Sequence, residues 1–395
     1  MIARQSFLSQ AAVSLIVAIF LVAAGGLAFS QNPHSDSFVY VGTYTNTPAK
    51  SQGIYSYHYD ARTGHLTSLG VAAELASPSF LATDPGHRVL YAVTEVGSDP
   101  NVKGARSDQT VSGYSIDART GALNFLNRVS FGGGAPCHLA VDNTGKMLFL
   151  TDYGSGRVVS YAINPDGSVG KQTGVGQDPG FSVNPGRQEG PHVHATVLSP
   201  DNRFLFTPDL GLDQIKIYKI DQATSTFTPN DPSSVAVNPC LGPRHFTFGR
   251  GAKFAYAICE MGSDVVAFSY RSTNGSLKPI QTISTLPTDF SGESTAAEIE
   301  IDESGRYLYV SNRGSDSIAV TRIDQRKGTL TMLQVASTTG RSPHGFKIDP
   351  AGKFLIAANQ NSNQLVLLKI DPHTGKLTPG DETVVVPSPV CVIFV

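Results

Sequence analysis

Four ionisable residues stand at points of the chain where a repeated strand pattern predicts apolar side chains: His194, Arg244, Glu260 and Arg313. Arginine keeps its charge at neutral pH, so Arg244 and Arg313 could bind a carboxylate or phosphate and stabilise a developing oxyanion. Glu260 or His194 could remove a proton from water if its pKa lies near the working pH. The set therefore predicts acid–base chemistry on a small molecule that carries, or develops, negative charge.

A recurring turn defines the elements that must position these residues. Each copy follows a short apolar run and precedes an alternating run of aromatic and β-branched residues, which predicts two strands, and two further strands follow before the next copy. Units of four strands repeated every ~50 residues indicate propeller blades. The turns are D-P-G-H-R (84–88), D-N-T-G-K (142–146), S-P-D-N-R (199–203), G-R-G-A-K (249–253), D-E-S-G-R (302–306) and D-P-A-G-K (349–353).

The two ends of the chain complete each other. Residues 38–44 have the pattern of a second strand with no innermost strand before it. Residues 389–394 have the pattern of an innermost strand with no blade after it. With the six complete units, they predict an all-β fold, a seven-bladed β-propeller over residues 38–395 whose ring is closed by the C-terminal strand. Closure removes the exposed edges of an open sheet.

Counting from the basic residue of each turn superposes the blades. Because neighbouring strands are antiparallel, the start of each innermost strand and the end of each second strand share one face, the funnel face, while the turns lie on the other. Nine positions upstream stand Ser79, Cys137, His194, Arg244, Ala297 and His344. Eight upstream stand Phe80, His138, Ala195, His245, Glu298 and Gly345. Seven downstream stand Glu95, Tyr153, Leu210, Glu260, Arg313 and Gln360, with Tyr44 from the first blade.

Five further residues of the funnel face are candidate substrate-binding residues: His192, Asp209, His245, Glu298 and His344. His245 and His344 each follow a proline within two residues, which also suits a structural hydrogen bond at the start of a blade. Asp209 also suits a role in fixing its own loop.

His192 and His194 are two residues apart, so an extended segment would carry both imidazoles on one face. With Glu260 they could form a metal site of the two-His, one-carboxylate kind. Nothing in the sequence shows that these three groups converge, so no metal ion is expected.

Residues 190–218, G-P-H-V-H-A-T-V-L-S-P-D-N-R-F-L-F-T-P-D-L-G-L-D-Q-I-K-I-Y, resemble the hallmark of the seven-bladed lactonase family. G-P-R-H-F-T-F, A-E-I-E-I-D, Y-V-S-N-R-G-S-D-S-I-A-V and S-P-H-G-F-K-I-D extend the likeness over 38–395. That family contains a bacterial 6-phosphogluconolactonase and fungal carboxy-muconate lactonizing enzymes. The resemblance implies that the protein hydrolyses a sugar-acid lactone with neither a metal nor an organic cofactor.

In the muconate enzymes one His, two Arg and one Glu are implicated in catalysis. By motif they fall here on His194, with His192 as the alternative, and on Arg244, Glu260 and Arg313. The resemblance thus implies a Glu or His base beside an arginine clamp. The chain departs from the family pattern at the residue before Glu260, which is a cysteine where many relatives have Asn.

Two alternatives to a lactonase stay open. The funnel of a non-catalytic propeller could bind an anion or dock a partner at the cell envelope, since one fold hosts many functions. A glutamate between two arginines favours an enzyme, because a pure anion binder gains little from an acid there. A muconate-type cycloisomerase would use the same four residues on a dicarboxylate.

The first thirty residues differ from the rest in composition. Arg4 gives a positive start, residues 11–24 are uncharged and apolar, and Ala28 and Ser30 are small residues at the positions that a signal peptidase requires. They predict a signal peptide over residues 1–30 and an exported protein, periplasmic or secreted. Such export is unusual for an enzyme of a cytosolic sugar-phosphate route. No membrane span is expected in the mature chain.

Charge and cysteine content limit the partners. The 395 residues carry a formal net charge of −2 and no basic run, so nucleic acid is not an expected partner. A small lactone or carboxylate is the expected ligand, and the protein is expected to be a monomer. The four cysteines form no C-x-x-C pair and are expected to be buried free thiols. Residues 171–190, 46–53 and 99–108 interrupt the repeat, and the first of these is expected to form a long loop over the funnel.

Overall fold

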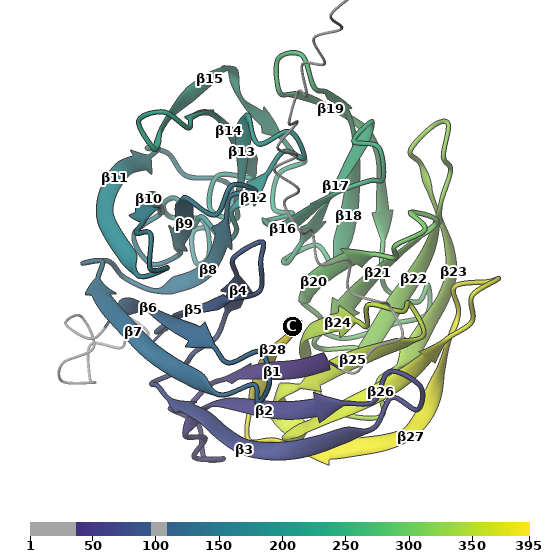
Figure 1. Ribbon diagram of the computed structural model, residues 1–395. Coiled ribbons are helices and arrows are strands. Elements are labelled where there is room, and N and C mark those ends of the chain that lie inside the picture. The colour runs from purple at the N-terminus through teal and green to yellow at the C-terminus, as the bar shows by residue number, and fades with distance from the viewer. Residues whose placement is uncertain (1–36, 96–108) are drawn as a thin grey trace, which may run out of the picture. The chain divides into compact units, whose positions relative to one another are not determined.

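The computed structural model describes residues 37–95 and 109–395, which form a β-propeller. Seven four-stranded antiparallel sheets, the blades, are arranged around a central axis, as Figure 1 shows. One 3-10 turn, η1 (Gln360–Ser362), interrupts the strands in this part of the chain. The predicted fold class and blade number are confirmed. The predicted signal peptide (1–30) and the insertion at 99–108 lie outside the described residues.

Blade 1 takes its innermost strand from the end of the chain, and blades 2–7 run in chain order from the axis outward. Blade 1 is β28 (Pro389–Phe394), β1 (Ser37–Thr43), β2 (Gly53–Tyr59) and β3 (Leu66–Glu74). Blade 2 is β4 (Leu81–Thr83), β5 (Val89–Val93), β6 (Thr110–Ile116) and β7 (Leu123–Ser130). Blade 3 is β8 (Pro136–Val141), β9 (Met147–Asp152), β10 (Arg157–Ile163) and β11 (Val169–Gln177). Blade 4 is β12 (Val197–Leu198), β13 (Phe204–Asp209), β14 (Gln214–Asp221) and β15 (Thr226–Ala236).

The last three blades follow the same order. Blade 5 is β16 (Pro243–Phe248), β17 (Phe254–Cys259), β18 (Asp264–Arg271) and β19 (Ser276–Ser284). Blade 6 is β20 (Ala296–Ile301), β21 (Tyr307–Asn312), β22 (Ser317–Ile323) and β23 (Leu330–Ser337). Blade 7 is β24 (Pro343–Ile348), β25 (Phe354–Asn359), β26 (Gln364–Ile370) and β27 (Leu377–Val385).

The C-terminal strand closes the ring, as the sequence predicts. β28 pairs antiparallel with β1, with Val41 opposite Val392 in the register. Phe38 and Val395 exchange two backbone hydrogen bonds of 2.9 Å beyond the last paired residues. The first and last strands therefore belong to one sheet, and the edge that β1 would otherwise expose is covered.

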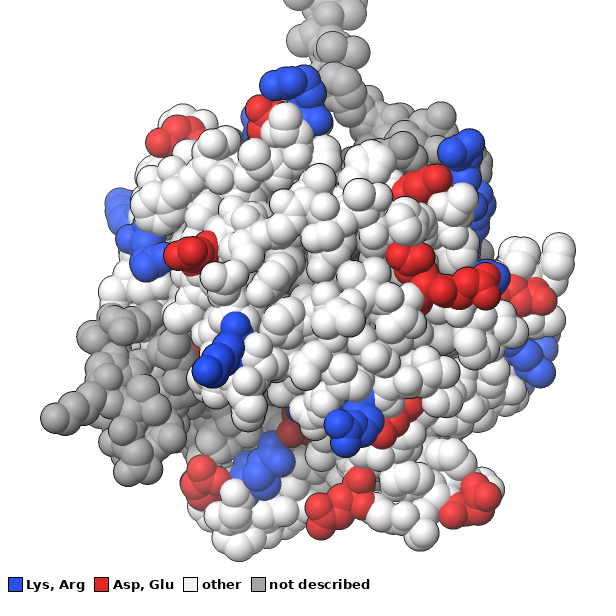
Figure 2. Space-filling view, turned by 90° about the horizontal axis from the view of Figure 1, so that it is seen from below, with Lys and Arg blue, Asp and Glu red and all other residues white. Residues whose placement is uncertain are grey.

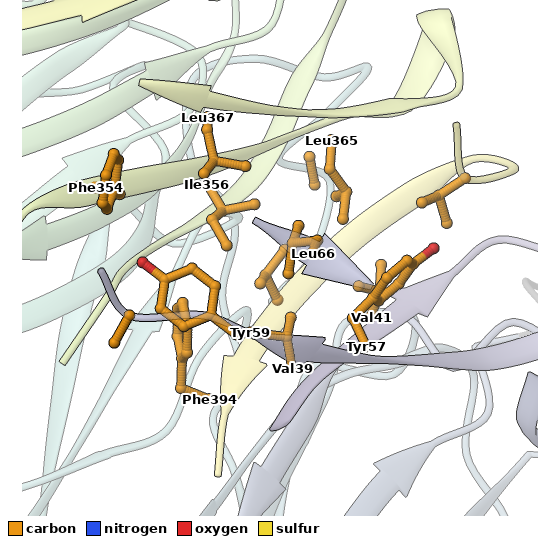
Figure 3. Close-up of a cluster of buried hydrophobic side chains, with 14 residues drawn as sticks. Val39, Val41, Tyr57, Tyr59, Leu66, Phe354, Ile356, Leu365, Leu367 and Phe394 are labelled. Atoms are coloured by element: carbon orange, nitrogen blue, oxygen red, sulfur yellow. The ribbon is translucent and has the colours of Figure 1, made fainter. Parts of the chain in front are cut away.

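The core consists of apolar layers between adjacent blades. Figure 3 shows the layer between blades 1 and 7, where Tyr59 and Phe394 meet edge to face at 5.0 Å between ring centroids. In β25, Ile356 belongs to this layer, whereas the neighbouring Leu355 and Ala357 belong to the layer toward blade 6. A blade packed on both faces needs apolar residues at consecutive positions, which explains why the second strands are nearly continuous apolar runs.

The recurring turn is held together by its first residue. Asp142 Oδ1 accepts hydrogen bonds from the backbone N–H groups of Lys146 and Met147, both at 2.8 Å. Asp349 makes the equivalent bonds in blade 7, at 2.7 and 2.8 Å. In blade 4, Ser199 Oγ takes over this role for the same two positions. In these blades, the first residue of the turn thus supplies a side-chain oxygen that satisfies two backbone donors before the second strand begins.

The surface matches the low charge content of the sequence. In Figure 2, lysine and arginine side chains lie singly or beside acidic ones, and wide uncharged areas separate them. No helix within 37–95 or 109–395 has the length and hydropathy needed to cross a bilayer.

Candidate active site

The funnel face encloses a cavity of about 220 Å³ near the propeller axis. That volume lies below the roughly 300–1,000 Å³ of pockets that take drug-sized ligands, which suits a small ligand. Its walls come from the starts of innermost strands, the ends of second strands and one loop of blade 3. The lining residues are Tyr44, Ser79, Phe80, Glu95, Cys137, Tyr153, Arg187, His194, Arg244, His245, Glu260, Glu298, Arg313, His344 and Val390.

Bulges in the innermost strands aim side chains into this cavity. The pairing of β16 with β17 shifts register between Pro243 and His245, so that Arg244 is the extra residue. The same shift occurs around Cys137 in β8 and around His344 in β24. A bulge bends its strand and redirects the extra side chain. The position nine residues before each turn therefore faces the cavity in several blades.

Glu260 is the centre of the charged groups. It directly follows β17, and its carboxylate is contacted by three guanidinium groups: Arg244 Nε at 3.1 Å, Arg313 Nη2 at 2.9 Å and Arg187 Nη2 at 2.6 Å. The Glu260 side chain is only 8% exposed. The structure thus brings together three of the four residues that the sequence predicts to be catalytic.

The protonation state of Glu260 follows from these contacts. Burial alone would raise the pKa of this carboxyl, but the three guanidinium charges, that of Arg313 first, outweigh burial and lower it to about 2. A carboxylate with so low a pKa is a weak general base at neutral pH. The Glu260 carboxylate is therefore ionised, and it neutralises charge of the three guanidinium groups that it contacts.

His194, the fourth predicted catalytic residue, also lines the cavity. Its Nδ1 lies 3.7 Å from Cys137 Sγ, and its ring contacts that of Tyr153 edge to face at 5.5 Å. Burial, followed by the positive charge of Arg244, lowers the pKa of His194 well below its usual value. The imidazole is therefore neutral near pH 7 and can accept a proton.

Three of the predicted substrate-binding residues line the cavity in a hydrogen-bonded chain. Arg244 Nη1 donates to His245 Nε2 at 3.0 Å, so the proton of this ring is on Nδ1, which donates to Glu298 Oε1 at 2.9 Å. Arg244 Nη2 donates to His344 Nε2 at 3.4 Å, and His344 Nδ1 lies 3.3 Å from the Val390 carbonyl. Together with Glu260, these residues hold the Arg244 guanidinium in place.

The other two predicted substrate-binding residues lie outside the cavity. The ring of His192 stacks on Tyr153 at 4.6 Å, and its Nε2 lies 3.2 Å from Glu189 Oε1. Asp209 Oδ1 accepts backbone hydrogen bonds from His192 and from the two residues after Leu210. Asp209 therefore holds a loop, and burial raises its pKa to about 6.

His192 and His194 both pack against the ring of Tyr153, but only His194 lines the cavity. Their segment pairs with the end of β13 through an isolated bridge between Val193 and Asp209, and β12 begins only at Val197. Within the part of the chain that the structure describes, no three His, Cys, Asp or Glu side chains are grouped as metal ligands.

Arg187 is the cavity residue that sequence reasoning missed. The expected loop over residues 171–190 is only partly correct, because β11 continues to Gln177 and extends blade 3. The loop begins after β11 and carries Arg187 to Glu260 and to Tyr153 Oη, which lies 3.3 Å from Nη2. Arg187 falls outside the repeat, so superposing the blades could not reveal it. Its only sequence signal is a basic residue within an insertion predicted to cover the funnel.

Tyr44, Ser79 and Glu95 form a second, polar part of the cavity wall. Tyr44 Oη donates to Glu95 Oε2 at 3.1 Å, and burial raises the pKa of Glu95. The neighbouring Ser79 is 4% exposed, and its hydroxyl lies beside the Glu95 carboxylate. The blade superposition places all three on the funnel face but gives them no role.

The cysteines correct one expectation. Cys137, Cys259 and Cys391 are buried free thiols, as expected, whereas Cys240 is exposed. Cys240 lies in the loop before β16 with a positive φ of 67°, and its backbone N–H donates to Asp213. That contact fixes the backbone of the loop and leaves the thiol outward. Cys259 is fully buried beneath Glu260 in the layer between blades 4 and 5.

Fold and site together define a class: a seven-bladed propeller whose axial cavity holds a buried arginine–glutamate cluster suited to a small anionic or ester-like ligand. Comparison with known proteins agrees. Residues 38–394 match the family described as lactonase, 7-bladed beta-propeller. The 6-phosphogluconolactonase of Bacillus subtilis is 35% identical over 355 residues, which cover 90% of this chain and 97% of the relative. The 6-phosphogluconolactonase of Formosa agariphila is 30% identical, covering 78% and 85%.

A solved structure gives the same result. The periplasmic gluconolactonase of Pseudomonas aeruginosa superposes with a TM-score of 0.84 at 32% identity, over 91% of this chain and 99% of that one. The chain belongs to the seven-bladed β-propeller lactonase family. The resemblance seen in the sequence is thereby confirmed, and the relatives' names place the chain among lactone hydrolases.

Proposed function

We propose that the protein hydrolyses a sugar-acid lactone in the axial cavity. The observation that carries this proposal is the buried cluster in which Arg187, Arg244 and Arg313 surround Glu260 inside a lactonase fold. The relatives named 6-phosphogluconolactonase and gluconolactonase support a lactone of a sugar acid as the substrate.

Hydrolysis needs a water nucleophile, a base and positive charge for the tetrahedral oxyanion. Arg244 and Arg313 supply the charge, and because both are held in place before substrate binds, they need not reorganise during the reaction. A lactone carbonyl that approaches them competes with Glu260 for the same donors. Such competition would draw Glu260 partly away from the arginines and restore some of its basicity.

His194 is the stronger candidate for the base. Burial and the charge of Arg244 lower its pKa and so weaken it as a base, but it is neutral, lines the cavity and forms no salt bridge in the described chain, whereas the Glu260 carboxylate is bound by three guanidinium groups. An oxyanion forming beside the arginines adds negative charge near His194, which favours the protonated imidazole. We therefore assign proton removal to His194 and orientation of the arginines to Glu260.

The predicted export and oligomeric state belong to the same proposal. A signal peptide over residues 1–30 would direct the protein out of the cytoplasm, and a relative described as periplasmic gives a precedent. A lactone outside the cytoplasm is more naturally an unphosphorylated sugar lactone than a sugar-phosphate intermediate. The protein would act as a monomer on this small molecule, without nucleic acid as a partner.

The test is hydrolysis of glucono-δ-lactone and 6-phosphoglucono-δ-lactone by purified wild-type protein and by Glu260→Gln, corrected for spontaneous ring opening. Loss of one cation-orienting carboxylate should lower kcat/KM about 100-fold or more. Glu303→Gln, an exposed glutamate of the blade 6 turn, is the matched control and should behave as wild type. Circular dichroism must show that Glu260→Gln is folded.

The outcomes separate the three functions. Activity that collapses in Glu260→Gln and persists in Glu303→Gln supports a lactonase. Equal activity in the two variants would remove Glu260 from the chemistry. Wild-type protein that opens neither lactone but binds gluconate would favour a non-catalytic anion binder, and turnover of a muconate instead would favour the cycloisomerase. A parallel His194→Asn variant tests the base.

A further inference from the structure

The cavity has two chemically different walls. Blades 5 and 6 and the loop after β11 of blade 3 contribute the arginines and Glu260. Tyr44 from blade 1 and Ser79 and Glu95 from blade 2 form a second wall that the proposed chemistry does not use. Within the described residues, no lysine or arginine forms a salt bridge with Glu95. Side-chain hydrogen bonds and the more distant charge of Arg244 oppose the effect of burial on the pKa of Glu95. Glu95 is therefore a second carboxylate of the cavity, and its place there calls for an explanation separate from that of Glu260.

One backbone carbonyl fixes this second wall. The Ser77 carbonyl accepts hydrogen bonds from the backbone N–H of Ser79 at 2.8 Å and of Glu95 at 3.0 Å. Ser77 Oγ also accepts from the N–H of Thr45, the residue after Tyr44, at 3.2 Å. Three residues from two blades are thus held side by side before any ligand arrives, which reduces the entropy lost on binding.

The hydrogen-bonding capacity of the wall is incompletely used. Tyr44 donates to Glu95 Oε2, and the Ser79 hydroxyl lies beside the same carboxylate and can donate to it. A carboxylate can accept about four hydrogen bonds, and the Ser79 oxygen receives none from the described residues. A ligand hydroxyl that donated to Glu95 or to the Ser79 oxygen would satisfy these acceptors and gain affinity.

The ligand chemistry that satisfies this wall is a hydroxyl pair. A carboxylate repels an anion, so the wall would not bind the carboxylate or phosphate that the arginines attract. An alcohol both donates and accepts, so one hydroxyl could donate to Glu95 while a neighbouring one exchanges a hydrogen bond with Ser79. Phe80, which packs against the His138 ring at 4.0 Å between centroids, adds an apolar surface for the carbon face of a ring.

We propose that Glu95, Ser79 and Tyr44 form a hydroxyl-binding subsite that selects polyhydroxylated lactones over lactones without ring hydroxyls. The inference rests on the proposed lactonase function and adds to it a division of labour: the arginine wall binds the reacting carbonyl, and the second wall binds the substrate's alcohol groups. Discrimination of this kind is strong when buried polar groups of the site are left unpaired by the wrong substrate.

The experiment compares kcat/KM for glucono-δ-lactone with kcat/KM for δ-valerolactone, which has the same ring but no hydroxyls. Wild-type protein should prefer the polyhydroxylated lactone, and Glu95→Gln and Ser79→Ala should each lower that preference about tenfold or more. Gln360→Ala is the matched control, because Gln360 holds the same repeat position in blade 7 as Glu95 in blade 2 but does not line the cavity. The proposal would be overturned if both variants kept the wild-type ratio of kcat/KM for the two lactones. A variant that loses activity on both lactones by the same factor also keeps that ratio.

A binding measurement separates this proposal from the lactonase proposal. Calorimetry with gluconate and with 5-hydroxyvalerate, the two ring-opened acids, needs no turnover. If wild-type protein opens no lactone, tighter binding of gluconate that is lost in Glu95→Gln would still support the subsite while the lactonase proposal fails. Equal affinity for the two acids, or no binding of either, would overturn the subsite.

Discussion

The two ends of each blade use the same repeat in opposite ways. At the turn end, Asp84, Asp142 and Asp349 do one job at one position, since each accepts hydrogen bonds from the two backbone N–H groups that open the second strand. At the funnel end, one position carries a serine, a thiol, two imidazoles, a guanidinium and a methyl group in different blades. The repeated turn residues thus give every blade the same structure, whereas the varied funnel residues supply the side chains of the site.

The two ends of a blade should also respond differently to mutation. A turn stabilises its own blade by local hydrogen bonds, so damage there should affect stability and leave the chemistry of each folded molecule intact. The funnel residues, in contrast, contact one another across blades. Arg244 of blade 5 contacts Glu260 of its own blade, the Ala297 carbonyl of blade 6 and His344 of blade 7. Damage there should affect the cavity as a whole.

The largest effect is expected at Arg244. Lysine keeps the charge but cannot reproduce the separate contacts of Nε, Nη1 and Nη2. Arg244→Lys should lower kcat/KM for the lactone about 100-fold or more, which corresponds to roughly 3 kcal/mol of transition-state stabilisation. Steady-state kinetics on glucono-δ-lactone measures it.

Arg250→Lys is the control for that experiment, because Arg250 is exposed in the turn of the same blade. Near wild-type kinetics are expected there. Comparable losses in both variants would show that the two ends of blade 5 are not functionally distinct.

A smaller effect concerns acid stability. Burial, followed by the charge of His245, keeps the pKa of His138 well below 6.5 in the folded protein, against the opposing influence of Glu298. The unfolded chain gains a proton at this residue as the pH falls through about 6.5 while the folded chain does not, so acid favours unfolding. Between about pH 7.5 and about pH 5.5, wild-type protein should lose about 1 kcal/mol more unfolding free energy than His138→Asn.

Urea denaturation at the two pH values measures that difference. Asparagine can still accept the hydrogen bond that the Thr196 N–H donates to His138 Nδ1 at 3.3 Å, so the variant should fold. Parallel losses in the two proteins would mean that His138 takes up its proton in the folded state as well.

The smallest effects belong to the turns. Gly352 has φ +67° and open space around the position of an added Cβ, so Gly352→Ala should cost about 1 kcal/mol from backbone strain alone. Ala252 holds the matching position in blade 5 with φ 47°, and Ala252→Gly should gain about 0.5 kcal/mol. Thermal unfolding measures both, with lactone hydrolysis per folded molecule unchanged. Shifts of the same sign would contradict the shared role of the two positions.

The sequence predicts the fold almost completely, because each blade repeats the same physical solution and the closing strand is visible as a missing partner. It also predicts that Arg244, Glu260 and Arg313, which lie in the repeat, share the cavity. It fails where the backbone leaves the repeat. Arg187 comes from an insertion that lies outside the repeat, and His192 packs on the same tyrosine as His194 without lining the cavity. The sequence also does not show how many arginines contact Glu260, and their number determines how far its pKa is lowered.

Closure by the C-terminal strand has a consequence for timing. A chain made from its amino end must carry β1 without its inner partner until β28, the last strand of the sequence, has left the ribosome. Blades 2–7 can form as they emerge, but the circle stays open for the whole of synthesis. Until that last step the inner edge of β1 has no partner, so the pairing of β28 with β1 both completes the first blade and closes the ring.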